Sequence, residues 1–253
     1  MCRLLGAVSA RPAPLAETLD ADLHAFAELS ALHCDGWGHA YLHGHDLTVV
    51  KAPEAALDSE QFWRSVGRAS TDAALLHLRM ASPGLAVDGL STHPFERDGV
   101  AFAHNGFAGT PAVLDHLVRE YDAPRARGTT DSERYFSLVL AGMRDRSPAE
   151  ALWWAAERIS ERADDVTALN ALLLTDQALY AFECWSPDAP ARPEAGEASY
   201  QLFARVTPEL VTVASDGWEA TSGWEPVGNG NVLEIRRGDL ATTVDEARTS
   251  LLA

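Results

Sequence analysis

Met1-Cys2-Arg3-Leu4-Leu5-Gly6-Ala7-Val8 opens the chain and places a cysteine just ahead of a continuous apolar run. Residues 4–8 predict a short buried strand, because apolar runs of this length are typical of strands covered on both faces. Removal of Met1 would leave the α-amine and the thiol of Cys2 on one residue. An α-amine has a pKa of about 8, so near neutral pH part of it is unprotonated and can accept the thiol proton. The position is also consistent with a cysteine that packs as a small apolar side chain.

Apolar periodicity predicts both strands and helices along the rest of the chain. Helical spacing favours helices over residues 15–32, 59–70, 111–121, 131–143 and 149–162, with Asp58 or Ser59 capping the second and Ser147-Pro148 opening the last. Strand-type runs occupy residues 37–42, 47–51, 73–79, 100–105, 168–174, 178–184, 200–206 and 210–214, and we expect the strands to end near Ile235. We expect the last four runs to form an antiparallel meander, interrupted at residues 186–199 by a mobile loop. These patterns favour sheets covered by helices, in α/β or α+β layers.

The composition is that of a globular protein of 253 residues, which we expect to form a single domain over residues 1–253. A net charge of −17 argues against nucleic acid and acidic membrane surfaces as partners, because both bind mainly through Lys and Arg. The N-terminal apolar run is too short for a membrane span and lacks the order of a signal peptide. Three cysteines without a Cys-x-x-Cys spacing favour neither disulfides nor zinc, so we expect a cytoplasmic protein.

The densest group of possible metal ligands lies between residues 33 and 45. It comprises His33, Cys34, Asp35, His39, His43 and His45. These residues lack the usual spacing of a zinc site, whereas Asp35-Gly36-Trp37-Gly38 is typical of a tight backbone turn beside an aromatic side chain. We therefore expect no metal here, and nothing in the sequence requires a cofactor.

Three polar positions at element ends are candidates for binding or catalysis. Arg79 ends an apolar strand, where a guanidinium is costly unless it reaches the sheet edge or meets an anion such as a carboxylate; His77, on the same side, fits a core histidine. The amide of Asn105 and the N–H of Gly106 can donate together to one oxyanion, although Asn-Gly is also a common turn. Asp131 begins a helix, where it can cap the helix or pair with an ammonium group. Each position taken alone favours a structural role.

The ordered motifs from residue 1 to about 135 resemble those of the class II glutamine amidotransferases. They comprise Met1-Cys2-Arg3-Leu4-Leu5-Gly6, Asp35-Gly36-Trp37-Gly38, Leu78-Arg79 with Ser82, Ser91-Thr92-His93-Pro94-Phe95, Ala103-His104-Asn105-Gly106 and Thr130-Asp131-Ser132-Glu133. The combination is far more specific than any one motif. The resemblance implies an α+β fold of the N-terminal-nucleophile kind, an αββα sandwich of two mainly antiparallel sheets with helices on the outer faces.

The resemblance also implies a role for each matched residue. Cys2 would be the nucleophile with its own amine as base, Asn105 and Gly106 the oxyanion hole, Arg79 the partner of a substrate α-carboxylate and Asp131 that of its α-ammonium, while Trp37, Gly38, Ser82 and His93 would shape the pocket. The set of Arg79, Asn105-Gly106 and Asp131 favours an amino-acid head group over the substrates of the bile-salt and penicillin-type amide hydrolases, which also begin with Met-Cys.

The implied reaction is hydrolysis of the γ-amide of glutamine or a small γ-glutamyl compound through a thioester on Cys2. We expect no room for a synthase domain after the last strands, which favours the stand-alone branch that includes the ergothioneine-pathway γ-glutamyl amidohydrolase. Two alternatives stay open: a glutaminase subunit that supplies ammonia to a separate synthase partner, and a γ-glutamyl-binding module without chemistry. The sequence does not identify the leaving amine.

Overall fold

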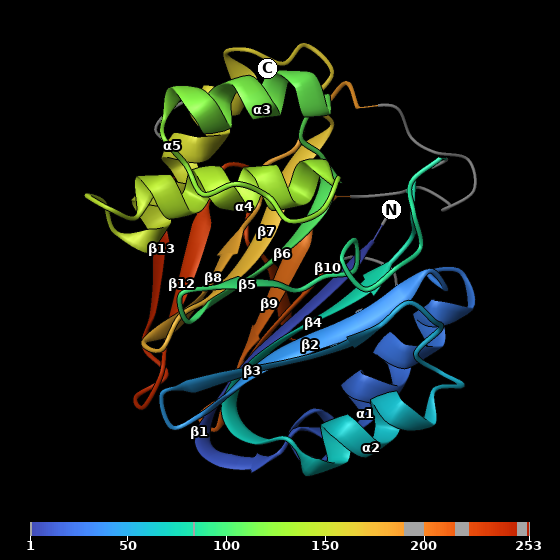
Figure 1. Cartoon of the computed structure of the whole chain (residues 1–253). Coiled ribbons are helices and arrows are strands. Elements are labelled where there is room, and N and C mark those ends of the chain that lie inside the picture. The colour runs from blue at the N-terminus through green and yellow to red at the C-terminus, as the bar shows by residue number, and fades with distance from the viewer. Residues whose placement is uncertain (1, 83, 190–199, 216–222, 247–251, 253) are drawn as a thin grey trace.

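The computed structural model describes residues 2–82, 84–189, 200–215, 223–246 and 252. Two β-sheets lie face to face, and helices cover their outer sides (Figure 1). The seven-stranded sheet has the order β11-β9-β10-β1-β4-β2-β3, and the six-stranded sheet has the order β13-β12-β8-β7-β6-β5. Neighbouring strands of the described chain pair antiparallel throughout. The predicted α+β sandwich with outer helices is therefore confirmed.

The elements alternate between the two halves of the sandwich along the chain. The seven-stranded sheet contains β1 (Arg3–Pro14), β2 (Gly36–His43), β3 (Asp46–Ala52), β4 (Ser70–Arg79), β9 (Leu202–Val206), β10 (Leu210–Ser215) and β11 (Trp224–Pro226). The six-stranded sheet contains β5 (Phe95–Arg97), β6 (Val100–Phe107), β7 (Ala168–Leu174), β8 (Ala178–Phe182), β12 (Val232–Arg236) and β13 (Thr242–Asp245). The helices are α1 (Leu15–Glu28), the short 3₁₀ helix η1 (Leu29–Ala31), α2 (Glu60–Arg68), α3 (Pro111–Glu120), α4 (Asp131–Gly142) and α5 (Pro148–Ser160).

Three apolar layers hold these elements together. Helices α1 and α2 pack on the outer face of the seven-stranded sheet, and α3, α4 and α5 pack on that of the six-stranded sheet. The third layer lies between the sheets and includes Leu4 of β1 and Leu75 of β4. Because side chains alternate along a strand, Leu76 and Leu78 point outward to α1 and α2, whereas His77 and Arg79 share the inner face with Leu75.

The helix starts follow the predicted capping chemistry. The hydroxyl of Ser59 accepts a hydrogen bond from the Phe62 amide at 3.1 Å, so Ser59 rather than Asp58 caps α2. Ser147 caps α5 in a capping box with Glu150. The first helix is shorter than predicted: its backbone is interrupted at Asp20, where φ is 41°, and it gives way to η1 after Glu28.

Two strand predictions were wrong, and two short strands were missed. The expected meander is divided, because β7 and β8 join the six-stranded sheet whereas β9 and β10 join the other. The strands also continue past Ile235, since β13 follows β12. The three-residue strands β5 and β11 were missed, as their length gives no periodic signal. Of the mobile loop expected at residues 186–199, residues 190–199 lie outside the described residues.

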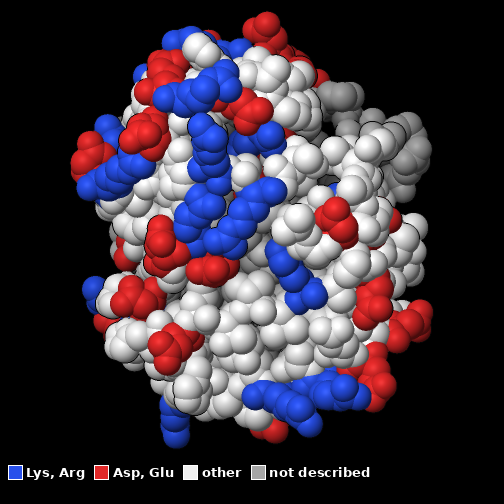
Figure 2. All heavy atoms as spheres, in the orientation of Figure 1, with Lys and Arg blue, Asp and Glu red and all other residues white. Residues whose placement is uncertain are grey.

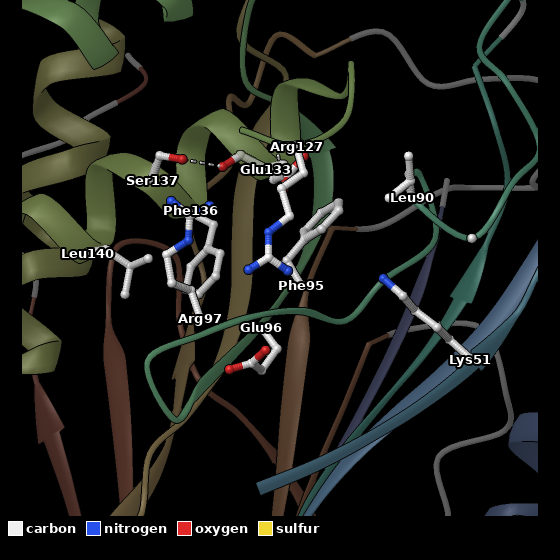
Figure 3. A pocket seen from close by; sticks show the side chains of 11 residues that line it. Lys51, Leu90, Phe95, Glu96, Arg97, Arg127, Glu133, Phe136, Ser137 and Leu140 are labelled. Carbon is white, nitrogen blue, oxygen red and sulfur yellow. Dashed lines mark hydrogen bonds between the residues drawn. The ribbon is translucent and has the colours of Figure 1, made fainter. Parts of the chain in front are cut away.

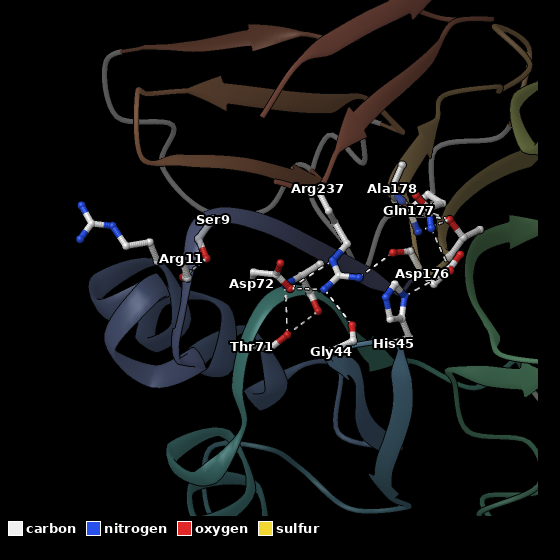
Figure 4. Close-up of polar contacts among 12 residues, drawn as sticks. Ser9, Arg11, Gly44, His45, Thr71, Asp72, Asp176, Gln177, Ala178 and Arg237 are labelled. Carbon is white, nitrogen blue, oxygen red and sulfur yellow. Dashed lines mark hydrogen bonds and ion pairs between the residues drawn. The ribbon is translucent and has the colours of Figure 1, made fainter. Parts of the chain in front are cut away.

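One end of the sandwich is joined by Arg237, which follows β12. Its guanidinium donates at 2.7 Å to Asp72 near the start of β4, at 2.9 Å to the carbonyl oxygen of Gly44, and at 2.5 Å to that of Asp176 (Figure 4). Asp72 and Gly44 belong to one half of the molecule and Asp176 to the other. Arg237 therefore ties the two sheets together at the end where β4 begins, and Arg79 lies at the opposite end of that strand. Within the described ranges, no helix has the length and apolar character needed to cross a membrane.

Candidate active site

Cys2 lies just before β1, beside the end of β4. Its thiol donates to the carbonyl oxygen of Met80 at 3.7 Å, and the pairing of Arg3 with Leu78 sets Cys2 next to Arg79. Burial raises the pKa of the Cys2 thiol, the charge of Arg79 opposes this rise, and that of Asp131 adds to it. The thiol therefore needs a base before it can act as a nucleophile.

Arg79 is a buried cation whose end groups are free to bind a ligand. It is 3% exposed, and neither Nη1 nor Nη2 has a hydrogen-bond partner among the described residues. The main chain around it is fixed by Asp35, whose amide donates to the Arg79 carbonyl at 3.1 Å and whose Oδ2 accepts from the Ala81 amide at 2.8 Å. A buried guanidinium without partners is costly, so this arrangement favours an anionic ligand.

Asn105 is a second buried group without partners, on the facing sheet. It is 1% exposed, and within the described part of the chain both Nδ2 and Oδ1 lack hydrogen bonds. Directly opposite, Asn170 donates to the Tyr200 carbonyl and accepts from the Cys184 amide. The contrast between these paired asparagines indicates that Asn105 is free to bind something other than the protein.

Gly106 follows Asn105 at a position that only glycine fits. Its φ is 147°, and a Cβ there would collide with the carbonyl oxygen of Ala168 on β7. His104 supports the same segment, because its Nδ1 lies 2.9 Å from the hydroxyl of Ser132 and its Nε2 lies 3.0 Å from the carbonyl oxygen of Ala168. The backbone of β6 is thereby fixed against both α4 and β7.

Asp131 is the first residue of α4, but it is not the cap. Thr130 is the capping residue and accepts from the Glu133 amide at 3.3 Å, so the capping alternative for Asp131 was wrong. The Asp131 carboxylate accepts from the Ala108 amide at 2.9 Å and from the Ser132 hydroxyl at 3.4 Å. A carboxylate is favourable at a helix N-terminus, and its charge acts on the Cys2 thiol.

Comparison with known protein families identifies the family of this chain. The family of class-II glutamine amidotransferases matches residues 1–189. This chain belongs to the class-II glutamine amidotransferases. A protein of Methanocaldococcus jannaschii is 29% identical over 197 residues, which are 72% of this chain and 51% of that protein.

Solved structures share the fold of this glutamine amidotransferase. A glutamine aminotransferase class-II domain protein from Silicibacter pomeroyi has a TM-score of 0.71 at 18% identity, over 98% of this chain and 100% of that one. The glutamine phosphoribosylpyrophosphate amidotransferase of B. subtilis has a TM-score of 0.66 at 17% identity, over 97% of this chain and 49% of that one. The fold is thus that of the N-terminal-nucleophile amidotransferases. The chain spans about half the length of the curated relatives it matches.

The expected pocket-shaping residues of this amidotransferase do not all lie together. Gly38 and His93 are adjacent, because a Cβ on Gly38 would collide with the His93 carbonyl oxygen. The His93 ring lies 4.2 Å from that of His77, on the inner face of β4. Trp37 pairs with Leu78, so its indole points outward and packs edge-on against Phe62 at 5.3 Å, away from the face of Cys2.

Ser82 lies in the loop after β4, three residues beyond Arg79. Its carbonyl oxygen accepts from the Leu85 amide at 3.1 Å, which begins a turn in that loop. The structure therefore places Ser82 close to Arg79 in the chain, and no described contact joins its hydroxyl to Cys2 or Asn105.

Ser215 is a residue that sequence reasoning missed. Its hydroxyl, buried at the end of β10, accepts from the Leu4 amide at 3.0 Å and donates to the Leu4 carbonyl at 3.5 Å. These contacts continue the β1–β10 ladder to within two residues of Cys2. No local signal marks Ser215, because its partner lies 211 positions earlier in the chain.

The remaining cysteines and histidines are dispersed. Cys34 is exposed, and Cys184 is buried, which raises the pKa of its thiol to about 12. His39 lies 2.8 Å from the Ser65 hydroxyl of α2, whereas His45 lies 3.4 Å from Asp176 at the far end of the sandwich. Among the described residues, no three of the types His, Cys, Asp and Glu are grouped as metal ligands.

Proposed function

We propose that this class-II glutamine amidotransferase hydrolyses the γ-amide of glutamine or of a small γ-glutamyl compound, through a thioester on Cys2 after removal of Met1. The observation that carries this proposal is a pair of buried groups without protein partners, the Arg79 guanidinium and the Asn105 amide. Both lie on inner faces of the facing sheets at the end where Cys2 lies. The Arg79 guanidinium suits a substrate charge that is present before the reaction, and the Asn105 amide suits a charge that develops during it.

The head group of the substrate would bind between Arg79 and Asp131. The two nitrogen atoms Nη1 and Nη2 of Arg79 match the two oxygens of an α-carboxylate. The carboxylate of Asp131, at the start of α4, suits an α-ammonium. The charges of Arg79 and Asp131 both act on the pKa of Cys2, which supports both residues lying near the nucleophile.

Thioester formation would begin with transfer of the thiol proton to the free α-amine of Cys2. The sulfur then adds to the γ-amide carbon, and the developing oxyanion accepts from the Asn105 amide and the Gly106 N–H. Collapse of this intermediate breaks the C–N bond, and the leaving amine takes the proton from the α-ammonium. The α-amine of Cys2 then deprotonates a water molecule, which attacks the thioester carbon. The Cys2 sulfur leaves and takes up that proton, so glutamate and the free thiol are released.

A stand-alone amidohydrolase, as in the ergothioneine pathway, is the form of this activity that we favour. A glutaminase subunit that supplies ammonia to a separate synthase partner is the second candidate. It is supported by the likeness in fold to the glutamine phosphoribosylpyrophosphate amidotransferase of B. subtilis. Strong activation of glutamine hydrolysis by a co-purified protein would favour the second candidate.

The test combines intact-mass measurement with an assay for glutamate release. The purified protein is offered glutamine and a series of γ-glutamyl amides that differ in the leaving amine. We expect turnover by a protein that lacks Met1, and an acid-quenched sample should carry one γ-glutamyl group on the peptide that contains Cys2. Turnover by protein that quantitatively retains Met1 would overturn the mechanism, and absence of hydrolysis for every substrate would favour the binding module.

A further inference from the structure

A cavity that Cys2 does not line lies between the two edge strands β3 and β5 and the side of α4. Its volume is about 160 Å³, below the roughly 300–1,000 Å³ of pockets for drug-sized ligands. Phe95, Phe136 and Leu140 form part of its apolar lining. Its charged lining comprises the cations Lys51, Arg97 and Arg127 and the carboxylates Glu96 and Glu133. Figure 3 shows Lys51 entering from β3 while Arg127 extends over Phe95 from the opposite side. The cavity therefore combines an apolar surface with converging positive charges.

Three cations and two carboxylates, those of Glu96 and Glu133, line the cavity, so positive charge is in excess there. None of the ion pairs formed within the described chain involves Lys51, Arg97 or Arg127. Glu133 is a buried carboxylate in the lining, and it already accepts hydrogen bonds from the main-chain amides of Arg127 and Gly128, at 2.9 and 2.6 Å. In a chain with a net charge of −17, a group of unpaired cations on one face is a local exception (Figure 2).

Donor capacity is left over at this cavity. The Lys51 ammonium donates to the carbonyl oxygens of Thr92 and Pro94 at 2.5 and 3.0 Å, which uses two of its three N–H groups. Arg97 donates through Nη2 to the Arg125 carbonyl at 3.0 Å, and the Arg127 guanidinium has no hydrogen bond within the part of the chain that the structure describes. A ligand with acceptor oxygens would satisfy these donors.

We propose that the cavity lined by Lys51, Arg97 and Arg127 binds a small organic anion, made of one carboxylate and an apolar body, at a site separate from Cys2. A carboxylate matches the planar fork of an arginine, and the body would rest on Phe95 and Phe136. The small volume of the cavity suits a ligand with a single carboxylate and a compact apolar body. The site goes beyond the proposed hydrolysis, and its occupancy is measured without any turnover.

The cavity is connected to the candidate active site through residues 92–95. Lys51 holds the carbonyl groups on both sides of His93, and the His93 ring packs at 4.2 Å on His77, two residues before Arg79. An anion that draws the Lys51 ammonium toward the cavity would weaken its hydrogen bonds to the carbonyl groups of Thr92 and Pro94. If the proposed hydrolysis is correct, the anion and the γ-glutamyl substrate should alter each other's affinity by the same factor.

Calorimetric titration of the full chain tests the site. Benzoate is the probe, benzamide its neutral isostere, and inorganic phosphate an anion without an apolar body. We expect benzoate to bind, benzamide not to bind, and phosphate to bind more weakly. Arg127→Met and Arg97→Met should each weaken benzoate binding about tenfold, since a hydrogen bond to a charged group contributes about 1.5–3 kcal/mol. Arg119→Met, which removes an exposed arginine of α3, is the matched control and should change nothing.

Lys51 allows a second measurement on the unaltered protein, because it is the only lysine in the sequence. Burial lowers its pKa to about 8, so its neutral amine is available to an acetyl N-hydroxysuccinimide ester. Benzoate should slow acetylation of Lys51 while leaving the N-terminal amine unaffected. Equal binding of benzoate and benzamide, equal effects of the Arg127 and Arg119 variants, binding of phosphate alone, or failure to protect Lys51 would each overturn the proposal.

Discussion

The Sγ atom of Cys2 lies 3.7 Å from the carbonyl oxygen of Met80, the residue that directly follows Arg79. The pairing of β1 with β4 thereby brings the proposed nucleophile and the proposed carboxylate partner to one end of the sandwich. The opposite end of β4 is tied to the other sheet through Asp72 and Arg237. One strand thus connects the fixed end of the fold to the end that carries the candidate site.

Cys2→Ala should abolish hydrolysis, whereas Cys34→Ala and Cys184→Ala should retain it. Only Cys2 has an α-amine available as a base after removal of Met1. Cys34 is exposed, and Cys184 is held protonated by burial, which raises its pKa to about 12. Glutamate release by the three purified variants provides the measurement, and a comparable loss for Cys34→Ala would implicate the segment of residues 33–45 instead.

Asn105→Ala and Asn170→Ala should separate catalysis from stability. The Asn105 side chain makes no hydrogen bond to any described residue, so its removal should leave thermal stability unchanged but lower kcat by about 10²–10³-fold if it donates to the oxyanion. Asn170 bonds to two main-chain groups, and its removal should cost about 1–3 kcal/mol of unfolding free energy. Denaturant unfolding measures the stability of both variants, and steady-state kinetics measures their kcat. If Asn105→Ala is destabilised while kcat holds, Asn105 is a packing residue.

Arg237→Met should destabilise the sandwich without touching the candidate site. The change leaves the partly buried Asp72 carboxylate and two carbonyl groups without their donor, which should cost about 2–4 kcal/mol. Asp72→Asn should cost less, and the double variant should show a coupling energy between the two positions. Additive effects in denaturant unfolding would mean that the contact contributes nothing to stability.

The protein should lose stability on acidification because histidines are buried in the neutral form. Burial lowers the pKa of His39 from its usual 6.5 to about 4. Between these values the unfolded chain binds a proton at His39 and the folded chain does not, so the free energy of unfolding falls as the pH falls from 6.5 to 4. His39→Leu should reduce this slope by up to about 1.4 kcal/mol per pH unit. Ser65 keeps its bond to the Phe62 carbonyl in that variant. An unchanged slope in urea titrations would show that His39 does not titrate in this range.

Local sequence patterns were sufficient to predict most helices and strands and to nominate the candidate residues, but not to show how those residues are arranged in the fold. Periodicity and caps predicted the helices because these depend on residues a few positions apart, as Ser147 and Glu150 do. The outward direction of Trp37 follows from its pairing with Leu78, a register that no local motif specifies. The ties from Ser215 to Leu4 and from Arg237 to Asp72 span 211 and 165 positions, so only the folded chain reveals them.

Asp131→Ala should chiefly weaken selection of the amino-acid head group. The α-ammonium of a substrate is charged before the reaction as well as during it, so its partner acts on the ground state and the transition state alike, and KM should rise more than kcat falls. Thr130 caps α4, so loss of the Asp131 carboxylate should leave that cap intact; only its bonds with the Ala108 amide and Ser132 are lost. The measurement compares a γ-glutamyl amide with the matching amide that lacks the α-amino group. Wild-type protein should prefer the first, and Asp131→Ala should narrow that preference about tenfold or more, because hydrogen bonds to charged groups contribute about 1.5–3 kcal/mol. Thr130→Ala serves as the control: it removes the cap and should lower stability while the preference stays. An Asp131→Ala variant with the full preference would mean that Asp131 only supports the Ala108 backbone and that the ammonium binds elsewhere.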